Sequence, residues 1–72
     1  MPRFNHQLMK EKRGELGLSL LDIVKRLYTK KLDMSEETLR SWEDGHTAPD
    51  AAKLMVLAEV LGCKIKEFYP NE

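Results

Sequence analysis

The chain has 72 residues, of which 42% are hydrophobic and 33% are charged, and its formal net charge is zero. This length and composition predict one small soluble domain, and we expect the chain to be complete and cytoplasmic. The single cysteine, Cys63, excludes an internal disulfide and a cysteine-rich zinc site. The N-terminus lacks the basic segment and apolar stretch of a signal peptide, and no apolar run approaches the roughly 20 residues of a membrane span.

The charges are unevenly distributed along the chain. Residues 1–32 carry eight Lys and Arg against three acidic residues, whereas residues 33–72 carry four against nine. This split predicts a polar molecule whose basic face suits phosphate or an acidic partner. Scattered, solvated charge is the alternative interpretation.

A first helix is expected over residues 5–16. Asn5 is a suitable N-cap, because its side chain can accept a hydrogen bond from an amide of the first turn. The helical spacing of Leu8, Met9 and Leu16 predicts that these three side chains point inward.

A second helix follows Ser19, which is a suitable N-cap with Asp22 at the third position of a capping box. Apolar residues then recur at i, i+3, i+4, i+7 and i+8, which is the strongest helical pattern in the sequence: Leu20, Ile23, Val24, Leu27 and Tyr28. Because YTKKL contains no helix breaker, we expect this helix to extend to about Lys31.

The stretch SEETLRSWEDG, residues 35–45, predicts a third helix with both ends defined. Ser35 is a suitable N-cap and Gly45 can adopt the left-handed conformation that ends a helix. At 100° per residue, Leu39 and Trp42 share the inward face. The opposite arc carries three acids, one base and a serine: Glu36, Glu37, Asp44, Arg40 and Ser41.

The last third of the chain predicts a loop and two more helices. HTAP is a loop, because Pro49 disfavours helix at the residue before it. Asp50 caps a helix over 51–61, and a short helix covers about 64–69. The residues expected to point inward in this part are Leu54, Leu57, Ala58, Leu61, Ile65, Phe68 and Tyr69, with Met9, Met34, Met55 and Cys63 as further core residues. No segment alternates for long enough to be a strand, so the fold class is all-α, with five short helices around one core.

Helices two and three, followed by WEDGHTAPD and LAEVLGCKIKEFY, resemble the phage-repressor-type helix-turn-helix domain of the XRE/Cro-like family. That family ends its recognition helix in Trp-Glu-x-Gly, here residues 42–45, and follows it with a loop carrying Pro and a helix ending in Leu-Gly. The resemblance covers residues 8–69 and implies that residues 1–72 form a single helix-turn-helix domain. The spacing from Ser19 to Ser35 exceeds the family's usual spacing, which implies a lengthened second helix or turn near residues 28–32.

The resemblance also implies functional residues. The helix over about 36–44 is expected in the major groove of DNA, with base-reading positions at Glu36, Glu37, Arg40 and Ser41. The turn after it is expected to contact phosphate, partly through its amides, at Asp44, Gly45, His46 and Thr47. The family often pairs an Arg late in helix one with the Glu after Trp, here Arg13 and Glu43. It usually places a polar, phosphate-contacting residue at the position of Leu20.

The inserted turn contributes two lysines, Lys30 and Lys31. If the turn lies beside the groove, these side chains can neutralise phosphates. A solubilising charged turn is the alternative.

Two functions remain open. The first is a sequence-specific DNA-binding transcription regulator of prokaryotic or phage type, such as a repressor, acting as a homodimer on double-stranded DNA. The second is a protein-interaction module, antitoxin-like or binding a regulator partner, that uses its acidic helix. The aromatic end at Phe68, Tyr69 and Pro70 is a candidate dimer surface.

We expect no enzymatic activity, because the sequence contains no combination of nucleophile, base and acid. His6 and His46 are isolated in the sequence and are expected at the surface. No metal, cofactor or membrane contact is expected.

Overall fold

The computed structural model of the chain describes residues 4–69. Its four α-helices are α1 (His6–Glu15), α2 (Leu20–Thr29), α3 (Glu36–Asp44) and α4 (Ala51–Leu61). The fifth element, η1 (Ile65–Phe68), is a short 3-10 helix, so the expected count of five short helices holds only if this turn is included. No strand occurs in the part of the chain that the structure describes, in agreement with the predicted all-α class.

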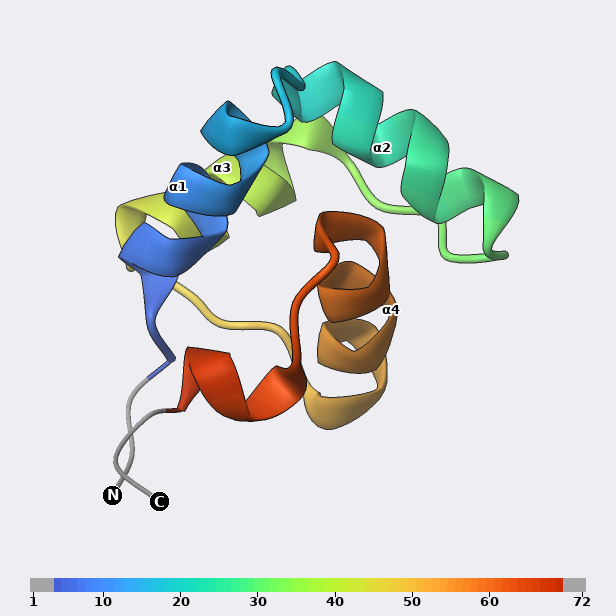
Figure 1. Cartoon of the computed structure of the whole chain (residues 1–72). Coiled ribbons are helices and arrows are strands. Elements are labelled where there is room, and N and C mark those ends of the chain that lie inside the picture. The colour runs from blue at the N-terminus through green and yellow to red at the C-terminus, as the bar shows by residue number, and fades with distance from the viewer. Residues whose placement is uncertain (1–3, 70–72) are drawn as a thin grey trace.

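The helices surround one core, with α3 packed between α1 and α2 (Figure 1). Helix α2 also contacts α4, and η1 closes the side formed by α1 and α4. This arrangement places α3 where two neighbouring helices fix its inner side.

Side chains cap all four α-helices at the residues expected from the sequence. The side chains of Asn5, Ser35 and Asp50 accept hydrogen bonds from amides of the first turns of α1, α3 and α4. Ser19 and Asp22 form a reciprocal capping box at the start of α2, with hydrogen bonds of 3.1 and 2.9 Å. The bond from the Ser19 amide lowers the pKa of the Asp22 carboxyl below its usual value. Each cap satisfies amides that the helix itself leaves without partners.

The second helix ends earlier than expected. It stops at Thr29 rather than near Lys31, because Lys31 adopts a left-handed conformation with φ of 66°. The amide of Leu32 then donates to the carbonyl of Leu27, which closes the helix end. The connection to α3 spans residues 30–35, longer than the three- or four-residue turn of the usual motif, so the expected lengthening lies in this turn.

The core contains side chains from every helix. Its buried members are Met9, Ile23, Leu27, Leu39, Trp42, Leu54, Leu57, Ala58, Leu61 and Phe68. Partly buried residues such as Leu8, Leu20, Val24, Met34, Cys63 and Tyr69 pack against them. Burial raises the pKa of the Cys63 thiol, as expected for a residue packed against the core.

Four predicted core residues are instead exposed: Leu16, Tyr28, Met55 and Ile65. Leu16 lies at the C-cap of α1, where the chain turns away through Gly17 and Leu18 packs inward in its place. Tyr28 lies in the last turn of α2, 100° around the helix from the buried Leu27. Met55 is 60% exposed because it lies 100° around α4 from Leu54, on the outer arc.

The two ends of the described chain lie side by side (Figure 1). The amide of Asn5 donates to the carbonyl of Phe68 over 2.7 Å. The ring of Phe4 stacks on Phe68 with centroids 5.3 Å apart and contacts Tyr69 at a tilt. Because Phe68 is completely buried within one chain, the idea that it contributes to a dimer surface is wrong; Pro70 lies outside the described residues.

The two faces of α4 predict opposite responses to truncation. Leu57→Ala removes a fully buried side chain and should lower the free energy of unfolding by about 2–5 kcal/mol. Met55→Ala, two residues earlier in the same helix, should change it by about 0.5 kcal/mol or less. Urea denaturation followed by circular dichroism measures both, and equal losses would contradict this packing of α4.

Candidate nucleic-acid interface

Helix α3 has a buried side and an open side. Leu39 and Trp42 pack into the core, and Glu43, only 7% exposed, lies beside them. The positions around Glu37 and Asp44 face away from the protein and are exposed. The open side is therefore the surface that α3 can present to a partner.

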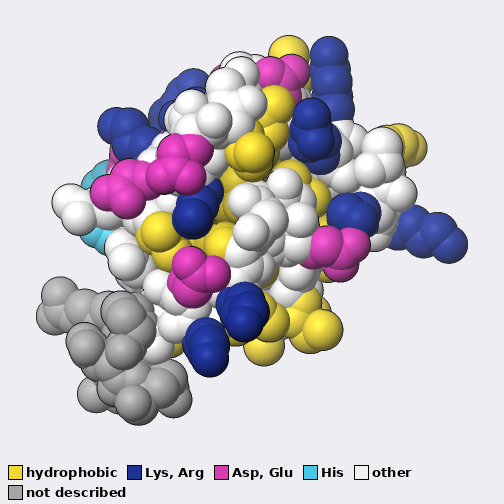
Figure 2. All heavy atoms as spheres, in the orientation of Figure 1, with side chains coloured by type: hydrophobic (Ala, Val, Ile, Leu, Met, Phe, Trp, Pro, Cys, Tyr) yellow, Lys and Arg dark blue, Asp and Glu magenta, His cyan; other side chains and the backbone are white. Residues whose placement is uncertain are grey.

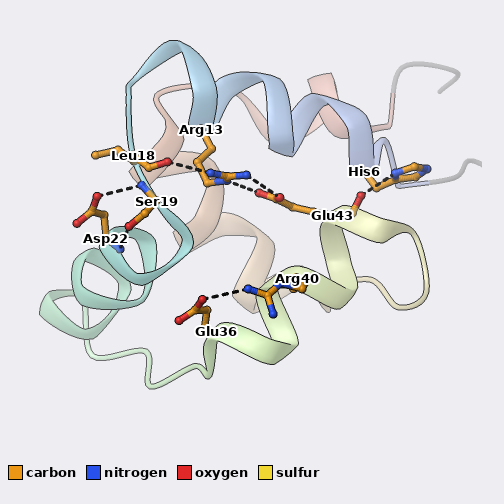
Figure 3. Close-up of polar contacts among 8 residues, drawn as sticks. All are labelled: His6, Arg13, Leu18, Ser19, Asp22, Glu36, Arg40 and Glu43. Atoms are coloured by element: carbon orange, nitrogen blue, oxygen red, sulfur yellow. Dashed lines mark hydrogen bonds and ion pairs between the residues drawn. The ribbon is translucent and has the colours of Figure 1, made fainter.

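The buried side of α3 is joined to α1 by an ion pair between Arg13 and Glu43 (Figure 3). Arg13 donates through Nε to Oε2 over 2.6 Å and through Nη2 to Oε1 over 3.0 Å. Its Nη1 donates to the carbonyl of Leu18 over 3.0 Å. The hydrogen bonds to Glu43 raise the pKa of the Arg13 guanidinium. One guanidinium thus links α1, the α1–α2 connection and α3.

His6 adds a contact that sequence analysis missed. Its Nδ1 lies 3.0 Å from the carbonyl oxygen of Glu43, and the ring is half-buried rather than isolated at the surface. A Cβ at Gly45 would lie 3.1 Å from two ring atoms of His6, so the ring occupies the space left by this glycine. No local signal in the sequence could reveal this contact, because the partners are 37 residues apart.

Gly45 ends α3 with φ of 82°, as expected for a left-handed cap. Its amide donates to the carbonyl of Trp42, and the amide of His46 donates to that of Ser41. Both amides therefore donate to carbonyls at the end of the helix, and the phosphate contact expected of this turn stays a prediction. The Ser41 hydroxyl lies 2.8 Å from that of Thr47 and ties the turn to the helix. The side chains of His46 and Thr47 remain exposed.

The residues at the expected base-reading positions have different surroundings. Arg40 donates to Glu36 over 3.1 Å, and both side chains are exposed (Figure 3). Glu37 is exposed and forms no ion pair with any residue in the described range 4–69. Ser41 is half-buried and bonded to the turn. The open side of α3 therefore carries one neutralised pair and further uncompensated acids.

The two lysines of the lengthened turn lie apart from the other expected phosphate contacts. The ammonium of Lys30 forms an ion pair with Glu59 of α4. Lys31 is exposed at the left-handed position. Figure 1 shows this turn at the end of α2 near α4, whereas the turn after α3 lies at the other side of the molecule, by α1.

Basic and acidic side chains alternate on the face drawn in Figure 2. Lys and Arg are scattered over it rather than gathered in one patch, which agrees with the alternative of scattered charge for this face. Within residues 4–69, no helix is long and apolar enough to cross a membrane. Among the described residues, no group of three or more His, Cys, Asp or Glu side chains lies close enough together to hold a metal ion.

Comparison with known proteins identifies one family. The model of the family described as helix-turn-helix matches residues 9–68, which is most of the chain. No curated protein and no solved structure shows significant similarity to the chain.

The ion pair predicts energetic coupling between α1 and α3. Arg13→Ala leaves the carboxylate of Glu43 buried without its partner and should lower the free energy of unfolding by about 3–5 kcal/mol. In the double variant Arg13→Ala/Glu43→Ala, the free energy of unfolding should fall by clearly less than the sum of the decreases in the two single variants. Lys12→Ala is the matched control, since the pair of half-buried Lys12 with exposed Glu15 should contribute at most about 1 kcal/mol. Additive losses in the cycle would contradict the pair.

Proposed function

Because the chain belongs to the helix-turn-helix family of phage-repressor type, a family of DNA-binding transcription regulators, we propose that it binds double-stranded DNA sequence-specifically through α3. In this proposal α3 enters the major groove with its open side. Members of this family are typically not enzymes, and we propose a cytoplasmic regulator that acts without a cofactor.

The observation that supports this function best is the rigid attachment of α3. Arg13 and His6 bond to the side chain and the carbonyl of Glu43, respectively, at the inner side of the helix. Reading bases requires side chains that are held in a fixed position relative to the groove. A helix that is attached to the protein on one side and open on the other holds its side chains in this way.

The proposed division of contacts follows the exposure of the side chains. Glu36, Glu37, Arg40 and Ser41 are the base-reading candidates, and a carboxylate can accept a hydrogen bond from cytosine N4. The phosphate-contacting candidates are Lys30, Lys31 and the turn residues Asp44, Gly45, His46 and Thr47. Within this set the exposed side chains of Lys31, His46 and Thr47 are better placed than the capped amides. Acting as a homodimer, two such helices would reach successive major grooves about 34 Å apart.

A second function is favoured by the charge of the open side. Glu37 and Asp44 are exposed there and face solvent without an ion-pair partner among residues 4–69. Two carboxylates repel the phosphates that line a groove, whereas they attract a basic protein surface. The alternative proposal is therefore a helix-turn-helix fold used to bind a basic protein partner through α3.

Salt dependence separates the two functions. Fluorescence anisotropy of a labelled random-sequence duplex should show binding that weakens on the order of 100-fold between about 50 and 200 mM salt, if about four phosphates are neutralised. Absence of binding at both salt concentrations, to random duplexes and to duplexes selected from a randomised pool, would contradict DNA binding. A pull-down with the immobilised chain would then test the protein partner.

The two lysines of the turn should contribute unequally to this binding. Lys31→Gln should flatten the log–log salt slope by about 0.9, the value for one lost phosphate contact. Lys30→Gln is the matched control and should change the slope less, because Glu59 already offsets the charge of Lys30. The slope is measured by anisotropy over a salt series, and an unaltered slope for Lys31→Gln would leave this lysine without a role in binding.

A further inference from the structure

The first turn of α3 carries one ion pair at its open surface. Glu36 is the first residue of the helix and Arg40 lies one turn later, with Arg40 Nη2 and Glu36 Oε2 3.1 Å apart. The side chain of Arg40 is 60% exposed and that of Glu36 is 45% exposed. Arg40 is also the only Lys or Arg in α3. Any base contact made by a cation of this helix must therefore come from a group already paired with a carboxylate.

The pair leaves most of its hydrogen-bonding capacity unused. A guanidinium has five N–H donors, and only one bond from Arg40 to a described residue is present. The other carboxylate oxygen of Glu36, Oε1, accepts from no described residue in this arrangement. The pair thus offers several donors and an acceptor next to each other on two exposed side chains, which Figure 3 shows joined on α3.

Donors on Arg40 beside an acceptor on Glu36 match a G·C base pair better than an A·T base pair. In the major groove a G·C pair presents two adjacent acceptors, guanine N7 and O6, followed by the cytosine N4 donor. An A·T pair places the adenine N6 donor between two acceptors, adenine N7 and thymine O4. A guanidinium that donates to N7 would therefore meet the N6 donor where guanine has its O6 acceptor. We propose that Glu36 and Arg40 read a single G·C base pair as one unit, Arg40 donating to guanine and Glu36 accepting from cytosine. The proposal rests on the DNA-binding function proposed above.

The electrostatics favour reading by a pair rather than by either residue alone. A lone carboxylate at the start of α3 would be repelled by the phosphates on both sides of the groove. Arg40 lies within hydrogen-bond distance of Glu36, so the two form a neutral unit whose entry avoids most of this repulsion. Glu37, on the same turn, has no such partner among residues 4–69 and serves as the internal comparison.

Selection from a pool of randomised duplexes tests the proposal with the full chain. The wild-type protein should enrich sequences with a G·C pair at one fixed position of each half-site. Arg40→Ala and Glu36→Ala should each lose discrimination at this position, on the order of 10- to 100-fold for Arg40→Ala, and leave the other positions unchanged. Glu15→Gln, the matched control, removes an exposed carboxylate of α1 outside the proposed site and should keep the preference at this position. Circular dichroism confirms that the variants remain folded.

A modified base then tests the hydrogen bonds themselves. Replacing the guanine at the fixed position with 7-deazaguanine removes one acceptor and should weaken wild-type binding by about fivefold. Binding of Arg40→Ala should be unaffected by the same replacement. The proposal is overturned if no G·C position is enriched, or if 7-deazaguanine weakens both proteins equally. Salt-dependent binding of random duplexes is measured on the same proteins, so the loss of base reading is distinguishable from the loss of DNA binding.

Discussion

The ion pair between Arg13 and Glu43 is the contact on which the position of α3 depends. Glu43 is a buried carboxylate, and a buried charge without a partner is unfavourable by several kcal/mol. Alternative placements of α3 would separate this charge from its guanidinium, so they carry that penalty in addition to lost packing. The bidentate geometry also fixes orientation, because both carboxylate oxygens are bound. The apolar contacts of Leu39 and Trp42 stabilise α3, and the ion pair specifies its register.

A fixed inner side leaves the outer side of α3 free to vary, and in this chain that side is acidic. The zero net charge, and the scatter of Lys and Arg over the face drawn in Figure 2, provide no strong general attraction for phosphate. Affinity for random DNA should therefore be modest, and discrimination between sequences must come from contacts to the bases. Pairing of Glu36 with Arg40 is one way in which an acidic helix can enter a groove without the full repulsion of its charge.

Local features were predictable from the sequence, and long-range ones were not. The four N-caps and most buried positions follow from residue type and helical spacing, which act within a few residues. Spacing does not reveal where neighbouring elements stop, so Leu16 and Tyr28 fit the pattern but lie beyond the core. Lys31 adopts the left-handed conformation although it is not a glycine, so the sequence does not mark this position as a helix end. For this reason α2 was expected to extend too far. The pairing of Arg13 with Glu43 was expected only from the family resemblance, and the role of His6 followed from neither source.

The lengthened turn changes where α2 can contact phosphate. The family's usual polar contact at the start of α2 is absent, because Leu20 cannot donate a hydrogen bond to an oxygen. Lys30 and Lys31 follow the other end of α2, and ten helical residues separate the two ends of this helix by about 15 Å. Lys30 is held to Glu59 of α4, which anchors the turn and gives Lys31 a defined position. A phosphate contact moved by this distance would widen the footprint along the duplex, so the turn would affect the site size as well as the affinity.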